Sequence, residues 1–417
     1  MYTMPVALQS VTTPPLPQTI SAPSRVLSID VLRGLTIALM ILVNDPGDWD
    51  HTYTQLDHAP WNGFTLTDFV FPNFLFLVGA SIIFSMHSRL ARGASKKTLA
   101  LHIFRRAFLI FAIKMLLTAY PHFHYTHFRI YGVLTRIALC YLVAGLICLF
   151  TQRARTLLLI TATLLVGYWA LMRFVPIPGL GVPTHNFLIL DPNNNLAAWL
   201  DRAFSAFTLR TVHTGTLYEH TRDPEGLLST LPAIATTLIG SITALWLREV
   251  KTNTRSSEAA VTLRGLATAG ACCMSFGLLW SLSFPINKNL WTSSYVLYSA
   301  GWSLLTLALC YWLIDMHRLN ETPAGKRLLW PWLVFGSNAI TAFVISNFLV
   351  LTLIWIKVPD SLSTTGKPVT TWFWVYHHLF ARHGSTNITS LVFAIAVVVV
   401  CLIPNWLLWR KRIFLKV

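Results

Sequence analysis

The amino-acid sequence predicts an all-α, polytopic membrane protein with about ten transmembrane helices in one bundle. Of its 417 residues, 54% are hydrophobic and only 12% are charged, and the chain carries 16 Trp and 25 Phe. This composition differs strongly from that of a soluble globular domain. The apolar residues also gather in runs long enough to cross ~30 Å of hydrocarbon. The sequence therefore argues against a soluble fold and implies the lipid bilayer as a partner.

These apolar runs predict the membrane-spanning helices in order along the chain. They cover residues 27–44, 65–87, 103–119, 131–150, 157–175, 227–247, 264–284, 293–314, 331–355 and 387–409. Each is close to the length that a helix needs to span a bilayer. An even number of crossings returns both termini to the same side of the membrane.

The N-terminal segment differs from the rest of the chain. Residues 1–24 are rich in Pro, Thr and Ser and have no continuous apolar core. They are predicted to be a short disordered cytoplasmic tail rather than a signal peptide. Residues 25–417 then form one transmembrane domain whose first helix acts as its own anchor.

The basic residues indicate the orientation. The net charge is +16, and most Lys and Arg fall in the loops of one face, for example at 89–106, 248–264 and 410–416. Most acidic residues fall in the loops of the other face. By the positive-inside rule, both termini are cytoplasmic. The charge follows the membrane, so nucleic-acid binding is not predicted.

The outer face carries two segments longer than simple turns, residues 176–226 and 356–386. Long loops of this kind are usually functional or disordered. Neither segment contains a second hydrophobic domain. The chain shows no internal repeat, which disfavours a transporter, because many transporters are built from repeats.

The stretch from residue 56 to 68, between the first two apolar runs, concentrates polar side chains. It holds His58, the two carboxylates Asp57 and Asp68, and the amide Asn62. Thr65 and Asp68 have the spacing of a capping box, so a helix is predicted to begin near Thr65. His58 then lies just outside a helix N-terminus on the outer face.

Several blocks of this sequence resemble one family. They are Ser28-Ile29-Asp30-Val31-Leu32-Arg33-Gly34, Val43-Asn44, His58-Ala59-Pro60-Trp61-Asn62-Gly63, Asp68-Phe69-Val70-Phe71-Pro72, Asp223-Pro224-Glu225-Gly226-Leu227-Leu228, Pro285-Ile286-Asn287-Lys288-Asn289-Leu290-Trp291 and Phe335-Gly336-Ser337-Asn338-Ala339-Ile340. In this order they are similar to the transmembrane acetyltransferases typified by heparan-α-glucosaminide N-acetyltransferase. The resemblance covers about residues 25–350, and it makes residues 25–417 a transmembrane acyltransferase domain.

The resemblance implies transfer of an acetyl group from cytoplasmic acetyl-CoA to the amine of an amino sugar on the far side of the membrane. Acetyl-CoA is then a co-substrate, and no metal is expected. We expect a glucosamine-type sugar of a cell-envelope glycan as acceptor and a bacterial inner membrane as location. The resemblance is compatible with a homodimer. A multi-span transporter or channel for a small polar or anionic solute is the alternative.

The family's active histidine corresponds to His58. Amide formation from a thioester needs an unprotonated amine, and histidine is the side chain suited to accept its proton near neutral pH. His58 could act as this base, or it could be acetylated first and pass the group on. The sequence does not choose between these two routes.

Other residues are assigned supporting roles. Asp68, and with less support Asp57, could orient the imidazole, although Asp68 could also be only a helix cap. Asn44 and Asn62 could donate hydrogen bonds to the thioester oxyanion. Asp223 and Glu225 could hold the incoming ammonium, or the Asp223 block could be a simple turn. The remaining acceptor residues are expected to be Trp61, Asn287 and Lys288.

The donor site is expected to use basic residues near or inside the spans. Charges inside a membrane are costly and indicate function. Arg136 lies inside the fourth run, and Arg33 could pair with Asp30 or face the cavity that admits CoA. Arg105 and Arg106 could bind the CoA phosphates or simply follow the positive-inside rule. Asn338 completes the predicted donor residues.

No metal site is predicted. His122, His124 and His127 are interleaved with aromatic residues and fit an interfacial belt better than a metal cluster. The six cysteines lie in apolar runs without a Cys-x-x-Cys pair, so they are expected to be small core residues.

Overall fold

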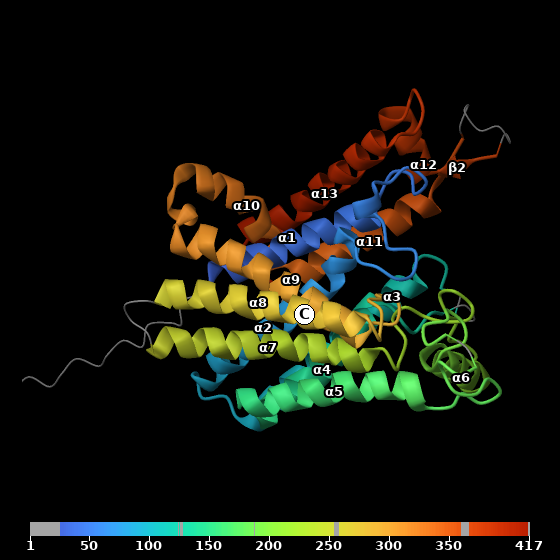
Figure 1. Cartoon of the computed structure of the whole chain (residues 1–417). Helices are drawn as coiled ribbons and strands as arrows, with labels where there is room; N and C mark the ends of the chain where they lie inside the picture. Colours follow the sequence, from blue (N-terminus) through green and yellow to red (C-terminus); the bar gives the residue numbers. More distant parts are fainter. Residues whose placement is uncertain are drawn as a thin grey trace, which may run out of the picture.

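The computed structural model describes residues 26–123, 125, 128–186, 188–253, 258–359 and 367–415. The predicted N-terminal tail lies outside these residues. Long helices run side by side through the described part of the chain, and the connections gather at the two ends of the bundle (Figure 1). The all-α polytopic class predicted from composition is confirmed.

Within the described residues, eight helices are long and apolar enough to cross a membrane. They are α1 (Leu27–Asn44), α2 (Leu66–Leu90), α4 (Val133–Phe150), α5 (Ala154–Phe174), α7 (Thr230–Asn253), α8 (Glu258–Ser281), α9 (Ser293–Tyr311) with its π-helical extension η3 (Trp312–Met316), and α13 (Asn387–Arg410). Helix α3 (Lys96–Ala119) covers the predicted third span. Its five basic residues make it more polar than the others.

The prediction of one continuous span over residues 331–355 is wrong. Two helices occupy this region, α10 (Pro323–Ser337) and α11 (Ala339–Trp355), and they meet at 82°. Asn338 at the junction has a non-helical backbone, and its side chain bonds the backbone of Ile413 and Leu415 after α13. The segment after α13 therefore satisfies both polar groups of the Asn338 side-chain amide at the break. Counting the bent pair as one crossing, nine segments pass the length and composition test.

Small residues bring the central helices together. A Cβ on Gly79 of α2 would lie 1.8 Å from the carbonyl oxygen of Thr237, and one on Gly240 of α7 would lie 1.9 Å from that of Phe76. Only glycine fits at such distances, as is common where transmembrane helices pack closely. The α2–α7 contact therefore holds the helix that begins after His58 in the middle of the bundle. Gly34 on α1 makes a similar approach to α10.

The two long segments predicted to lie outside the membrane, residues 176–226 and 356–386, contain regular structure. Helix α6 (Leu196–Val212) lies in the first, and Asn195 caps it by accepting the N–H of Ala198 at 2.8 Å. The second holds a two-residue antiparallel ladder of β1 (Lys357–Val358) and β2 (Val369–Thr370), the helix α12 (Thr371–Val375) and the π-helical turn η5 (Tyr376–Phe380). Both segments lie at one end of the bundle, opposite α10 (Figure 1). The sequence did not predict α6.

Candidate functional site

The N-terminus of α2 is built as the sequence predicts. Thr65 caps the helix by accepting the N–H of Asp68, and a carboxylate oxygen of Asp68 accepts the N–H of Thr65 at 3.1 Å. This is a complete capping box. It fixes the position of Asp68, whose side chain is 1% exposed.

The same carboxylate contacts His58. Its Oδ1 lies 2.7 Å from Nδ1 of His58, and its Oδ2 also accepts the N–H of Ala59 at 3.1 Å. Since the backbone groups around this carboxylate are all donors, it accepts at each contact, and Nδ1 carries the imidazole proton. In the neutral imidazole, Nε2 then carries the lone pair. Asp68 therefore both caps α2 and orients His58, so the two predicted roles are compatible.

Asp57 has a different position. Its Oδ1 accepts the backbone N–H of His58 at 2.7 Å, and its carbonyl accepts the Thr65 hydroxyl at 2.7 Å. Among the described residues, the side chain of Asp57 bonds the backbone of the His58 loop rather than the imidazole nitrogens.

A lysine from far along the chain approaches the imidazole. Nζ of Lys288 lies 3.0 Å from Nε2 and 3.3 Å from Nδ1 of His58. Lys288 belongs to the loop between α8 and α9 and is half-buried. Burial lowers the pKa of its ammonium, against the opposing charges of Glu225 and Asp68. The His58 imidazole thus lies between a carboxylate and an amine.

The loop that carries Lys288 is fastened to the loop that carries His58. Asn287, which is fully buried, donates to the carbonyl of Trp61 at 3.0 Å and to the side-chain oxygen of Asn62 at 3.2 Å. The N–H of Gly63 donates to the carbonyl of Ile286 at 2.9 Å. Trp61 and Asn287 therefore hold two blocks together that are distant in the sequence.

Trp61 also links this assembly to the outer segment before α6. Its indole N–H donates to the carbonyl of Leu190 at 2.8 Å, and the Arg222 guanidinium lies 4.5 Å from its ring centroid. The tryptophan is thus wedged between the His58 loop and the outer surface.

The carboxyl groups of Asp223 and Glu225 are already paired with a cation of the protein, the guanidinium of Arg129. Arg129 donates to both oxygens of Asp223 at 2.7 and 2.6 Å and also to Glu225. Burial raises the pKa of the Glu225 carboxyl, but the charges of Arg129, Arg136 and Lys288 bring it below its usual value. The two acids predicted to receive an ammonium are therefore already paired with a cation of the protein itself. Sequence reasoning missed Arg129, which stands out only as a basic residue in an acidic outer loop.

Arg136 lies in the first turn of α4 and is 1% exposed. Its Nη2 donates to the carbonyl of Gly226 and the hydroxyl of Ser229, and its guanidinium lies 5.0 Å from the ring centroid of Trp291. Its Nε and Nη1 have no hydrogen-bond partner among the described residues. Arg136 is also close to the Glu225 and Lys288 charges at this end of the bundle.

The other predicted residues lie elsewhere. Asn44 is the last residue of α1 and is exposed, whereas Arg33 lies about 16 Å nearer the start of that helix. Arg33 pairs with Asp30 at 3.2 Å and donates to Ser81 at 3.0 Å. Arg105 is exposed, and Arg106 lies over the Tyr141 ring at 4.7 Å. Asn338 is in the α10–α11 break.

Tyr295 is a further contact that the sequence did not indicate. Its hydroxyl donates to the carbonyl of Asp68 at 2.6 Å, and the side chain is fully buried in α9. It therefore ties α9 to the first turn of α2, beneath the His58–Asp68 pair.

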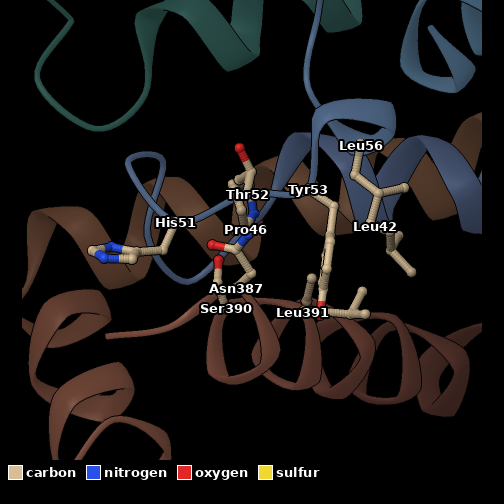
Figure 2. Close-up of a pocket in the computed structure, with 10 residues that line it drawn as sticks. Leu42, Pro46, His51, Thr52, Tyr53, Leu56, Asn387, Ser390 and Leu391 are labelled. Carbon is tan, nitrogen blue, oxygen red and sulfur yellow. The ribbon is translucent and has the colours of Figure 1, made fainter. Parts of the chain in front are cut away.

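A shallow pocket lies beside this site rather than in it. It is formed by the loop after α1, with Pro46, His51 and Tyr53, and by Ser390 and Leu391 of α13 (Figure 2). Nδ1 of His51 lies 2.8 Å from Asp48. The chain thus has a second imidazole–carboxylate pair on the same face, which offers an internal comparison for His58.

No group of three or more potential metal ligands occurs among the described residues. His122 is described, whereas His124 and His127 of the predicted aromatic belt lie outside the described part of the chain.

Comparison with known proteins gives consistent results. Residues 25–279 match a family model described as heparan-alpha-glucosaminide N-acetyltransferase, catalytic. The human heparan-alpha-glucosaminide N-acetyltransferase is 30% identical over 367 residues, which cover 77% of this chain and 52% of the human protein. The mouse protein is 30% identical over 369 residues, covering 78% and 53%. The chain spans about half the length of these curated relatives.

Proposed function

The chain belongs to the heparan-alpha-glucosaminide N-acetyltransferase family, and on this premise we propose that it transfers an acetyl group from cytoplasmic acetyl-CoA to the amine of an amino sugar on the extracytoplasmic side. The observation that carries the proposal is the His58–Asp68 pair, whose carboxylate leaves Nε2 of the imidazole as a proton acceptor. A base of this kind is what amide formation from a thioester requires.

In the proposed reaction, Nε2 of His58 takes a proton from the neutral sugar amine as its nitrogen attacks the thioester carbonyl. The carbon–sulfur bond breaks, and the CoA thiolate leaves with a proton from the imidazolium. Asp68 stabilises the imidazolium through its 2.7 Å contact with Nδ1. The covalent route uses the same atom, because Nε2 would carry the acetyl group before the sugar arrives.

The acceptor side of the proposed site comprises the residues around the imidazole. Trp61 and Asn287 hold the two loops together, and Asn62 supplies an amide group that can donate to the oxyanion. Asn44 lies apart from them, exposed at the end of α1, and supplies a second amide at the level that the thioester has to reach. Asp223 and Glu225 are buried against Arg129, and they attract the acceptor's ammonium through their charge rather than by direct contact. Arg136 offsets this negative charge from the inner side.

The donor side uses cations nearer the opposite end of the bundle. Arg33, Arg105 and Arg106 contact the phosphates of CoA. Asn338 lies at the junction of α10 and α11, and the preceding residues of α10 contact α1 through Gly336. The thioester arm then has to reach along α1, from the level of Arg33 to that of Asn44. In this proposal, donor and acceptor bind at opposite faces of the membrane.

The proposal includes an orientation and an acceptor class. Both termini face the cytoplasm of a bacterial cell, and α3 completes an even number of crossings with the eight apolar helices and the bent pair. The acceptor is a glucosamine-type sugar of a cell-envelope glycan, and the protein acts as a homodimer or a monomer.

The test is an acceptor panel. Purified protein in lipid nanodiscs is incubated with isotope-labelled acetyl-CoA and, separately, glucosamine, galactosamine, mannosamine and glucose. Label in an N-acetylated amino sugar, absent with glucose, is the expected result. Uptake of sugar into proteoliposomes without acetylation would identify a transporter and contradict the proposal.

A further inference from the structure

The amine of Lys288 lies where the proposed reaction needs the amine of its acceptor. Nζ is 3.0 Å from Nε2 of His58, within hydrogen-bond distance of the atom that receives the acceptor's proton. A sugar amine in a reactive arrangement has to approach the same nitrogen to a similar distance. The protein therefore presents an amine of its own to its proposed base.

The surroundings hold this amine in place. Asn287, the preceding residue, is fully buried and bonds Trp61 and Asn62 in the loop that carries His58. The neighbouring N–H of Gly63 bonds Ile286. The backbone at Lys288 is therefore held against the loop that carries His58, and its Nζ lies beside both ring nitrogens, 3.0 Å from Nε2 and 3.3 Å from Nδ1.

The amine is also easier to deprotonate than an ordinary lysine. Burial and the charge of Arg136 lower the pKa of Lys288, and the charges of Glu225 and Asp68 only partly oppose this. The unprotonated fraction, which is the nucleophilic form, is thus larger than in an exposed lysine.

From this geometry we infer that Lys288 is a site of self-acetylation, modified by acetyl-CoA with the help of His58 when no amino sugar is bound. The inference rests on the proposed acetyl transfer. The amine of Lys288 gives a proton to Nε2 and attacks the thioester carbonyl, the carbon–sulfur bond breaks, and CoA leaves as the thiol with the proton from the imidazolium. The products are an acetamide on Nζ and free CoA.

Self-acetylation has two consequences. It removes the positive charge next to His58 and adds an acetyl group in the space that the sugar amine would occupy. It also means that acetyl label on the protein without acceptor does not by itself identify an acetyl-histidine. The amide on lysine is stable to digestion, and the site of the label can therefore be read directly.

The experiment incubates the full chain in nanodiscs with labelled acetyl-CoA and no sugar, and maps acetylated lysines by mass spectrometry over time. Lys357, exposed in β1, reports uncatalysed acetylation. We expect label on Lys288 to exceed that on Lys357, and glucosamine to suppress the label on Lys288 alone. His58→Ala should slow Lys288 acetylation by about 10²–10⁴-fold and leave Lys357 unchanged.

Two variants serve as matched controls. Lys288→Arg keeps the charge and should reduce total label to the uncatalysed level, whereas Lys357→Arg should leave Lys288 labelling unchanged. Equal labelling of Lys288 and Lys357 overturns the inference. Labelling of Lys288 that glucosamine does not change overturns it as well. Glucosamine acetylation measured in parallel separates the two proposals, because transfer to sugar without Lys288 acetylation refutes only the self-acetylation.

Discussion

The carboxylate of Asp68 contacts His58 and caps a membrane helix at the same time. Its Oδ1 lies 2.7 Å from Nδ1 of His58, and its Oδ2 accepts the N–H groups of Ala59 and Thr65 at 3.1 Å. Orientation of the imidazole is thus built into the start of α2. The stability of this helix end and the chemistry of His58 depend on one side chain.

Asp68→Asn is expected to separate these two roles. The amide has one donor and one acceptor, so it cannot accept from both His58 and the two backbone N–H groups. If its NH₂ faces Nδ1, the proton moves to Nε2 and the proposed base is lost. We expect transfer to fall by about 10²–10⁴-fold, measured as the initial rate of amino-sugar acetylation.

Thr65→Ala is the control for the cap, and it also removes the hydroxyl's bonds to the Asp57 carbonyl and the Asp68 carboxylate. It removes the hydroxyl that accepts the Asp68 N–H and should cost about 1 kcal/mol of stability, with a much smaller loss of rate. Equal rates in Asp68→Asn and Thr65→Ala would show that orientation of His58 by Asp68 does not matter for transfer.

The Arg129 cluster is expected to stabilise the outer end of the bundle. Its partners Asp223 and Glu225 are 0% and 11% exposed at the side chain, so Arg129→Leu leaves two buried negative charges. Breaking a buried pair in this way typically costs about 3–5 kcal/mol. A thermal unfolding midpoint in detergent measures the loss.

Arg129→Lys should retain part of that stability, because it keeps the charge without the two-pronged contact with Asp223. An unchanged midpoint in Arg129→Leu would mean that water or another cation compensates both acids.

Arg33 and Arg105 are expected to affect donor binding differently. Arg33 is held by Asp30 and Ser81 and is partly buried, whereas Arg105 is exposed. Loss of a hydrogen bond to a charged group costs about 1.5–3 kcal/mol, so Arg33→Leu should weaken acetyl-CoA binding about 10- to 100-fold. Calorimetric titration of acetyl-CoA into the protein in nanodiscs measures this change in affinity.

Arg105→Leu should have a smaller effect that shrinks further as salt is raised, since exposed charges are screened within about 8–10 Å. Unchanged donor affinity in Arg33→Leu would return Arg33 to a purely structural role at the α1–α10 contact.

The local parts of the site could be predicted from the sequence, and the distant ones could not. Thr65 and Asp68 are three residues apart, and spacing of that kind determines a helix cap without tertiary information. Lys288 approaches His58 from 230 residues away. Nothing in the pattern around Lys288 specifies that partner, although the resemblance had grouped both residues with the acceptor.

The break between α10 and α11 and the presence of α6 were not predicted for a similar reason. Residues 331–355 contain no charged residue, and at the break the side chain of Asn338 bonds the backbone of Ile413 and Leu415. Hydropathy measures the length of an apolar run and not whether it bends. Helix α6 is amphipathic and short of a full span, so a search for membrane-spanning runs passes over it.

The orientation of the bundle is tested by reporter fusions. Fusions after Arg92, between α2 and α3, should report the cytoplasm, and fusions after Asp50 and Asn194 should report the outside, because the basic residues cluster on one face. An external report at Arg92 would reverse the sidedness of the proposed site, with acetyl-CoA and sugar exchanging faces.

The final prediction concerns His58 and uses the chain's second imidazole–carboxylate pair as its control. His58 is 44% exposed at the side chain and contacts Asp68, whereas His51 is 43% exposed and lies 2.8 Å from Asp48 in the same outer loop. Removal of either imidazole should therefore disturb folding to a similar, small extent. Only Nε2 of His58 faces Lys288 and the proposed acceptor position.

We expect His58→Ala to reduce acetyl transfer by about 10²–10⁴-fold while acetyl-CoA still binds, because the proposed phosphate contacts lie towards the other end of α1. His51→Ala should retain transfer. Initial rates and donor affinity, measured on the same nanodisc samples, give both quantities. If His58→Ala transfers within a few-fold of His51→Ala, the base is not His58, and proton acceptance has to pass to Asp68 or to an amine that binds already deprotonated.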